Sequence, residues 1–83
     1  MSPLAADVVG LIGSAVMVAA YAYSNVAKRL DFRLFNLLNL VGALLLIASL
    51  TIHFNLASMV LEVVWAAIAL IGLGKALRTR GRT

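Results

Sequence analysis

The chain has 83 residues, of which 64% are hydrophobic, 12% are charged and none is cysteine, and its net charge is +4. A soluble domain of this size has too little interior to hide so much apolar surface. The absence of cysteine excludes disulfides, thiol nucleophiles and thiolate metal sites. The basic residues flank apolar runs, so they predict membrane topology and no nucleic-acid partner.

The first predicted helix covers residues 4–27. Ser2 is placed as its N-cap and Pro3 at its first position, where proline is favoured. Residues 8–27 carry no charged side chain, and at about 1.5 Å per residue they span about 30 Å, one hydrocarbon thickness. Asp7 precedes this run and basic residues follow it, the reverse of a secretory signal, so we expect the segment to be a retained spanning helix.

Two further helices are predicted, over residues 32–53 and 56–77, followed by a basic tail over 78–83. Asp31 would cap the second helix. The 28 residues between Arg33 and Glu62 contain no Asp, Glu, Lys or Arg. This uncharged segment is too long for one crossing of the membrane and too short for two. We therefore place the turn at residues 53–55, with Asn55 capping the third helix.

Three crossings would bring every basic side chain to one side of a bilayer. Lys28, Arg29 and Arg33 follow the first crossing, and the remaining Lys and Arg residues follow the third. The positive-inside rule makes that side cytoplasmic. The sequence thus predicts one all-α domain over residues 1–83, integral to the bacterial inner membrane, with the N-terminus outside and the C-terminus inside. Arg78, Arg80 and Arg82 are expected to contact anionic lipid.

Glu62 is the acidic residue predicted to lie inside the membrane, about 10 Å from the outer face. An ionised carboxylate there costs several kcal/mol unless it is paired or wetted. Glu62 could couple a proton or bind a cation. Alternatively, it could join the third helix to the second through His53, Thr51 or Ser49.

Asn36 and Asn39 are three residues apart and should share a helix face. They could bind a neighbouring helix or line a polar path. Trp65 lies too deep for the interfacial aromatic belt, so it should pack in the core or stack on a flat substrate.

No combination of residues predicts catalysis, so we expect no enzyme activity, no cofactor and no metal site. Small residues follow one face of the third helix, including Ser58, Ala66, Ala69 and Gly72. Such faces let transmembrane helices approach closely, and this one predicts contact with a second copy of the chain.

The chain resembles an uncharacterised bacterial family of short, permease-like integral membrane proteins with three helices. The resemblance covers residues 21–73 and rests on three motifs, Asn39-Leu-Val-Gly42-Ala-Leu-Leu-Leu, His53-Phe-Asn55 and Glu62-Val-Val-Trp65. It implies the architecture and no substrate.

In architecture alone the chain is similar to bacterial half-size sugar transporters, which are homodimers of three-helix protomers. That similarity implies a site between protomers, with Asn39 and Trp65 as candidate contacts. The Pro-Gln pair of those transporters is absent here, and Ser24-Asn25 occupies its neighbourhood. Two functions are therefore expected. One is a homodimeric half-size permease with a polar path lined by Asn36, Asn39, Glu62 and Trp65, and the other is a non-transporting structural or accessory protein.

Overall fold

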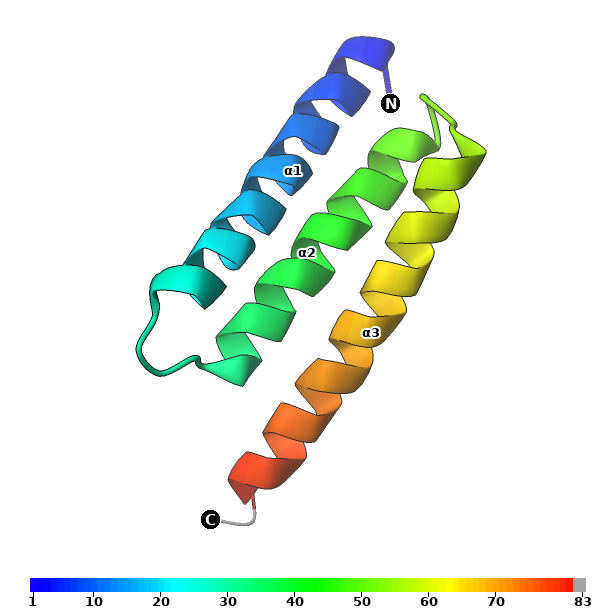
Figure 1. Cartoon of the computed structure of the whole chain (residues 1–83). Helices are drawn as coiled ribbons and strands as arrows, with labels where there is room; N and C mark the ends of the chain where they lie inside the picture. Colours follow the sequence, from blue (N-terminus) through cyan, green and yellow to red (C-terminus); the bar gives the residue numbers. More distant parts are fainter. Residues whose placement is uncertain (82–83) are drawn as a thin grey trace.

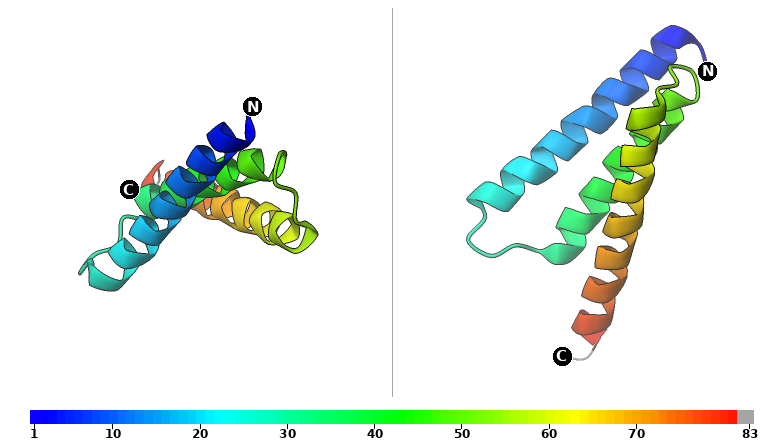
Figure 2. Two further views of the ribbon diagram at one scale, coloured as in Figure 1. Left: turned by 90° about the horizontal axis from the view of Figure 1, so that it is seen from above. Right: turned by 45° about the vertical axis from the view of Figure 1, so that its right-hand side comes forward.

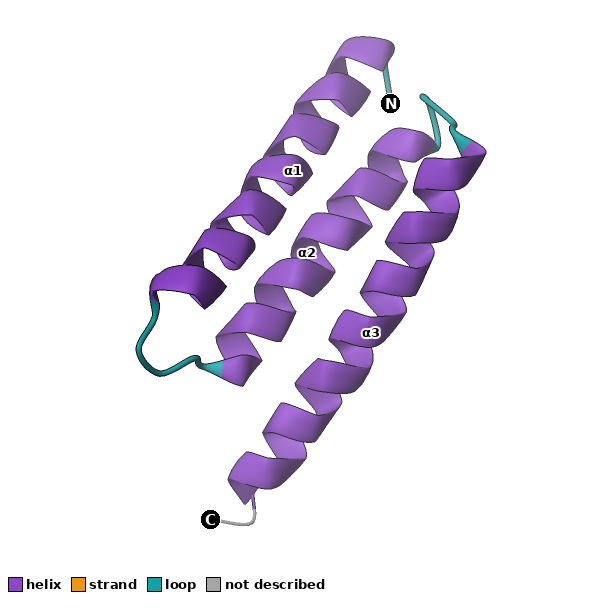
Figure 3. Ribbon diagram, viewed as in Figure 1, coloured by secondary structure: helices purple, strands orange, loops and turns teal. Residues whose placement is uncertain are grey.

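The computed structural model describes residues 1–81, with side chains as far as residue 78, and consists of three antiparallel helices (Figures 1 and 3). Helix α1 spans Pro3–Val26, α2 spans Phe32–Leu50 and α3 spans Leu56–Gly81. All three are long and apolar enough to cross a membrane. The all-helical prediction with three candidate spans is therefore confirmed.

Each helix begins at the polar residue that the sequence indicates. The Ser2 hydroxyl accepts a hydrogen bond from the Ala5 N–H at 3.1 Å. Asp31 Oδ1 accepts from the backbone N–H groups of Arg33 and Leu34, at 3.0 and 3.2 Å. Before α3, Asn55 Oδ1 accepts from the Ser58 N–H at 3.0 Å. In all three cases a side-chain oxygen satisfies an N–H group that has no partner within its own helix.

Two helix ends differ from the sequence prediction by more than one residue. Helix α2 ends at Leu50 instead of residue 53, because the chain tightens into a turn in which the N–H groups of Thr51 and Ile52 bond to the carbonyls three residues earlier. Helix α3 continues to Gly81, so residues 78–81 extend the helix instead of forming a separate tail. Arg82 and the side chain of Arg80 lie outside the described residues.

The helices form an open layer with α2 in the middle. Helix α2 packs against both neighbours, whereas the backbones of α1 and α3 do not approach each other within the described part of the chain. In the right-hand view of Figure 2, the end of α1 and the end of α3 diverge. The layer measures 46 × 22 × 20 Å. Large apolar side chains remain exposed on all three helices.

Helices α1 and α2 approach closely because glycines face each other at their crossing. A Cβ atom on Gly13 would lie only 2.9 Å from the carbonyl oxygen of Gly42. The alanines on either side, Ala6 and Ala20 on α1 and Ala43 on α2, are fully buried. Small residues thus replace a conventional core, and backbone packing holds the two helices together.

The two ends of the layer differ in charge. The loop after α1, the start of α2 and the end of α3 share one end (Figure 1), and this end holds Lys28, Arg29 and Arg33 together with Lys75 and Arg78. The other end holds the start of α1 and the turn before α3, with Asp7 and His53. The described basic residues therefore gather at one end.

Candidate functional site

The contact between α2 and α3 is centred on Asn39 and Trp65. The Trp65 indole N–H donates a hydrogen bond to Asn39 Oδ1 at 3.0 Å. The amide nitrogen of Asn39 donates to the Phe35 carbonyl, one turn earlier in α2, at 2.9 Å. Asn39 is buried, while Trp65 is 41% exposed, so the indole packs at the edge of the helix contact and not within a core. Asn39 and Trp65, which the sequence analysis proposed as candidate site residues, thus contact each other directly.

Asn36 lies one turn nearer the basic end and faces α3 at Gly72. A Cβ atom on Gly72 would lie 2.7 Å from Cγ of Asn36, so this glycine provides the space that the amide occupies. The amide nitrogen of Asn36 donates to the Phe32 carbonyl at 2.8 Å. Gly72 was predicted as part of a small-residue face toward a second copy, yet it packs against α2 of its own chain.

A pocket of about 240 Å³ opens beside these contacts, between α2 and α3. It is lined by Phe35, Asn36, Asn39, Trp65, Ile68 and Ala69. The structure therefore brings three of the four candidate path residues together around one space. Each of the two amide nitrogens is engaged with its own helix, so the pocket has a largely apolar wall with amide oxygens and one indole at its border.

Glu62, the fourth candidate, lies one turn from Trp65 on α3 and does not line this pocket. Its side chain is buried, at 9% exposure. The Oε1 atom is inaccessible and has no hydrogen-bond partner among the described residues. A buried carboxyl oxygen without a donor is costly, so Glu62 is the least satisfied polar group in the helix layer.

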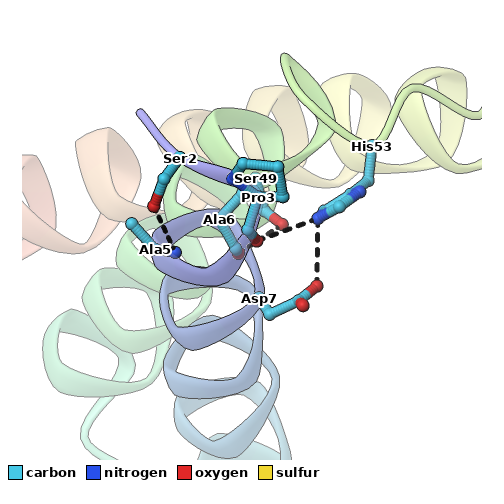
Figure 4. Close-up of polar contacts among 7 residues, drawn as sticks. All are labelled: Ser2, Pro3, Ala5, Ala6, Asp7, Ser49 and His53. Carbon is cyan, nitrogen blue, oxygen red and sulfur yellow. Dashed lines mark hydrogen bonds and ion pairs between the residues drawn. The ribbon is translucent and has the colours of Figure 1, made fainter.

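The structure does not pair His53 with Glu62. Instead, His53 Nε2 lies 3.0 Å from Asp7 Oδ1 and 3.1 Å from the Pro3 carbonyl oxygen, and so joins the turn to the start of α1 (Figure 4). The other suggested partners are also engaged elsewhere. Ser49 donates to the Ala6 carbonyl at 2.7 Å, and Thr51 donates to the Ala48 carbonyl at 2.6 Å.

Sequence reasoning missed Ser49 as a contact of α2 with α1, and Asp7 as a contact of α1 with the turn after α2. The contact of Asp7 could have been predicted from the number of crossings, because two antiparallel helices bring residue 7 and the turn after α2 to the same end. Within residues 1–81 no three metal-binding side chains come together, so the described part of the chain offers no candidate metal centre. The chemistry available is hydrogen bonding by two amides and one indole, with one buried carboxyl group nearby.

Comparison with known proteins gives a family and no further relatives. A protein-family model matches residues 6–80. No curated protein and no solved structure matches the chain, so the similarity to half-size sugar transporters and to permeases gains no support. The matched residues include all of α2, nearly all of α1 and α3, and each of the motifs noted in the sequence. The chain, with its three apolar helices, therefore belongs to this uncharacterised family.

Proposed function

We propose that this protein is a multi-pass protein of the bacterial inner membrane, with its N-terminus outside and its C-terminus in the cytoplasm. Three helices of spanning length and hydropathy support the insertion. The orientation is supported by the described basic residues, which lie together at one end of the layer. They are Lys28, Arg29, Arg33, Lys75 and Arg78.

A reporter fused to each terminus tests the topology. An odd number of crossings places the two reporters in opposite compartments, with the C-terminal one in the cytoplasm. Finding both reporters in the same compartment would overturn the proposal, because it would require an even number of crossings and would separate the basic residues.

Within the membrane, we propose that the protein works as a homodimer. Its accessible surface is 5746 Å². A folded monomer of 8.8 kDa exposes about 4800 Å². The excess of roughly 950 Å² is of the same order as the ~800 Å² that each partner buries in a standard interface. A second copy against the open layer would cover this surface.

We propose that the role of the dimer is structural or accessory, and the Trp65–Asn39 hydrogen bond carries this conclusion. It joins two helices of one chain, in the manner of polar residues that hold transmembrane helices together. Asn36 likewise fills the space left by Gly72. These side chains are engaged in holding α2 and α3 together, and a helix pair held this way suits a protein that presents a fixed surface to another membrane protein.

A half-size permease is the second candidate, and the unpaired Oε1 atom of Glu62 is the observation that favours it. In this second candidate the polar path runs between α2 and α3 of each protomer of the homodimer, where the carboxyl group and the nearby amides border it. Transport would then occur by rocking one protomer against the other around residues near the bilayer midplane.

Vesicles reconstituted with the purified protein distinguish these two functions. Proton uptake driven by an imposed potential is followed with an enclosed pH-sensitive dye, for the unaltered chain and for Glu62→Gln and Glu62→Leu. The accessory role predicts no flux above that of protein-free vesicles. It also predicts a dimer that tolerates both Gln and Leu in detergent, because the Glu62 side chain is buried within its own chain and its Oε1 has no described partner to lose. Flux that Gln abolishes in a folded, dimeric protein would overturn the accessory role and establish the permease.

A further inference from the structure

A second groove lies between α2 and α3 at the basic end of the layer. Its volume is about 320 Å³, and it is lined by Asp31, Arg33, Leu34, Leu37, Leu73 and Leu77. It shares no lining residue with the pocket at Asn39 and Trp65. Its walls are four leucines, and both of its charged groups come from the start of α2. An apolar slot with charge at one end is an amphipathic site.

The positive group of this groove is available to a ligand. Arg33 is half-buried, and its guanidinium forms no ion pair with any described residue. The neighbouring Asp31 accepts from two backbone N–H groups through its Oδ1 at the start of α2, and its single negative charge is outnumbered by the basic side chains at this end. Lys75 and Arg78 of α3 lie at the same end of the layer and add positive charge there. The groove therefore favours an anion next to its apolar walls.

The apolar part of the groove continues along α2. Leu34, Leu37, Val41 and Leu44 are exposed by 40–53%. Their spacing of three and four residues places them in one stripe on the helix surface. The rise from Arg33 to Leu44 is about 16 Å, which is about half of the ~30 Å hydrocarbon thickness. This stripe has the length of an acyl chain in a single leaflet.

We propose that this groove binds one anionic phospholipid. The lipid phosphate lies at Arg33, and one acyl chain follows the leucines of the groove and the stripe toward the bilayer centre. A basic site between transmembrane helices on the cytoplasmic side is the arrangement that recognises anionic head groups. This inference rests on the proposed membrane topology and holds for either the accessory protein or the permease.

The test uses the full chain purified in a neutral detergent and native mass spectrometry. The protein is titrated separately with phosphatidylglycerol, with phosphatidylcholine of the same acyl chains, and with glycerol 3-phosphate. Phosphatidylglycerol is expected to bind at least about fivefold more tightly than phosphatidylcholine, the factor that one basic contact contributes. Equal binding of the two lipids would overturn the anionic site. Equal binding of glycerol 3-phosphate and phosphatidylglycerol would show a site for a soluble anion and would overturn the lipid site.

Arg33→Gln and Arg29→Gln form a matched pair, because both remove one positive charge at the same end. Arg29 is exposed in the loop and does not line the groove. Arg33→Gln should weaken phosphatidylglycerol binding about fivefold, and Arg29→Gln less than twofold. Equal losses would mean a general charge effect and would overturn the site. If Arg33→Gln does not fold, the lipid preference of the unaltered chain decides the outcome. Terminus labelling tests the topology separately, so a correctly inserted chain without this preference overturns the lipid site alone.

Discussion

The close approach of α1 to α2 gives a prediction that can be worked out from two glycines. In Gly13→Ala the new Cβ atom would lie 2.9 Å from the carbonyl oxygen of Gly42 and 2.9 Å from Cβ of Leu45. Ordinary contacts between such atoms begin at about 3.5 Å. The first of these neighbours is backbone, which no side-chain rotation can move. The alanine therefore fits only if α1 shifts away from α2, and overpacking of this kind costs about 1–3 kcal/mol.

Gly74→Ala is the control, because a Cβ atom at Gly74 would meet nothing within 4 Å. Both substitutions replace a glycine inside a helix, and each gains up to about 1 kcal/mol from the better helix propensity of alanine. This gain cancels in the comparison. The free energy of unfolding of Gly13→Ala should therefore fall below that of Gly74→Ala by about 1–3 kcal/mol.

Unfolding by sodium dodecyl sulfate in mixed micelles, followed by far-ultraviolet circular dichroism, measures this difference. Gly74→Ala should be as stable as the unaltered chain or slightly more stable. A difference of less than about 0.5 kcal/mol between the two variants would refute the close packing of α1 on α2, because surface substitutions of no structural consequence differ by that much.

Two further predictions use the same titration. Ser49→Ala removes the hydrogen bond from α2 to the Ala6 carbonyl of α1 and should lower the free energy of unfolding by about 0.6–1.7 kcal/mol. Ser14 donates its hydroxyl hydrogen bond to the Gly10 carbonyl of its own helix, so Ser14→Ala should lower the free energy of unfolding by less. Equal losses of stability in the two variants would contradict the contact between α1 and α2. Asp31→Ala removes the cap of α2 and should cost about 1 kcal/mol, whereas Asp31→Asn keeps an oxygen acceptor and should recover most of it. A fully stable alanine variant would show that the cap contributes nothing.

The polar residues of this protein connect the helices in two separate places. At the basic half of the layer, Asn36, Asn39 and Trp65 join α2 to α3. At the opposite end, Ser49 joins α2 to α1, and His53 joins the turn after α2 to α1. Helix α2 thus holds both neighbours, whose backbones do not approach each other in the described residues. A perturbation of α2 should therefore affect both contacts, whereas changes on the outer faces of α1 and α3 should affect neither.

The sequence by itself determined the helices and where each begins. Charge-free runs of membrane-spanning length gave three spans, and Ser2, Asp31 and Asn55 marked the N-caps that the structure shows. These features depend on neighbours within one helical turn, which the sequence displays directly. The far ends of α2 and α3 were less accurately predicted, because apolar residues continue past Leu50 and basic residues remain helical up to Gly81.

Only the tertiary structure decided which side chains meet. The contact of His53 with Asp7, the hydrogen bond of Trp65 to Asn39 and the leucine groove beside Arg33 all depend on how each helix is rotated about its axis. Nearly uniform apolar helices carry little sequence signal for that rotation, because almost every face could be buried. The rotation is set instead by the places where glycines permit backbones to approach and where polar groups find partners.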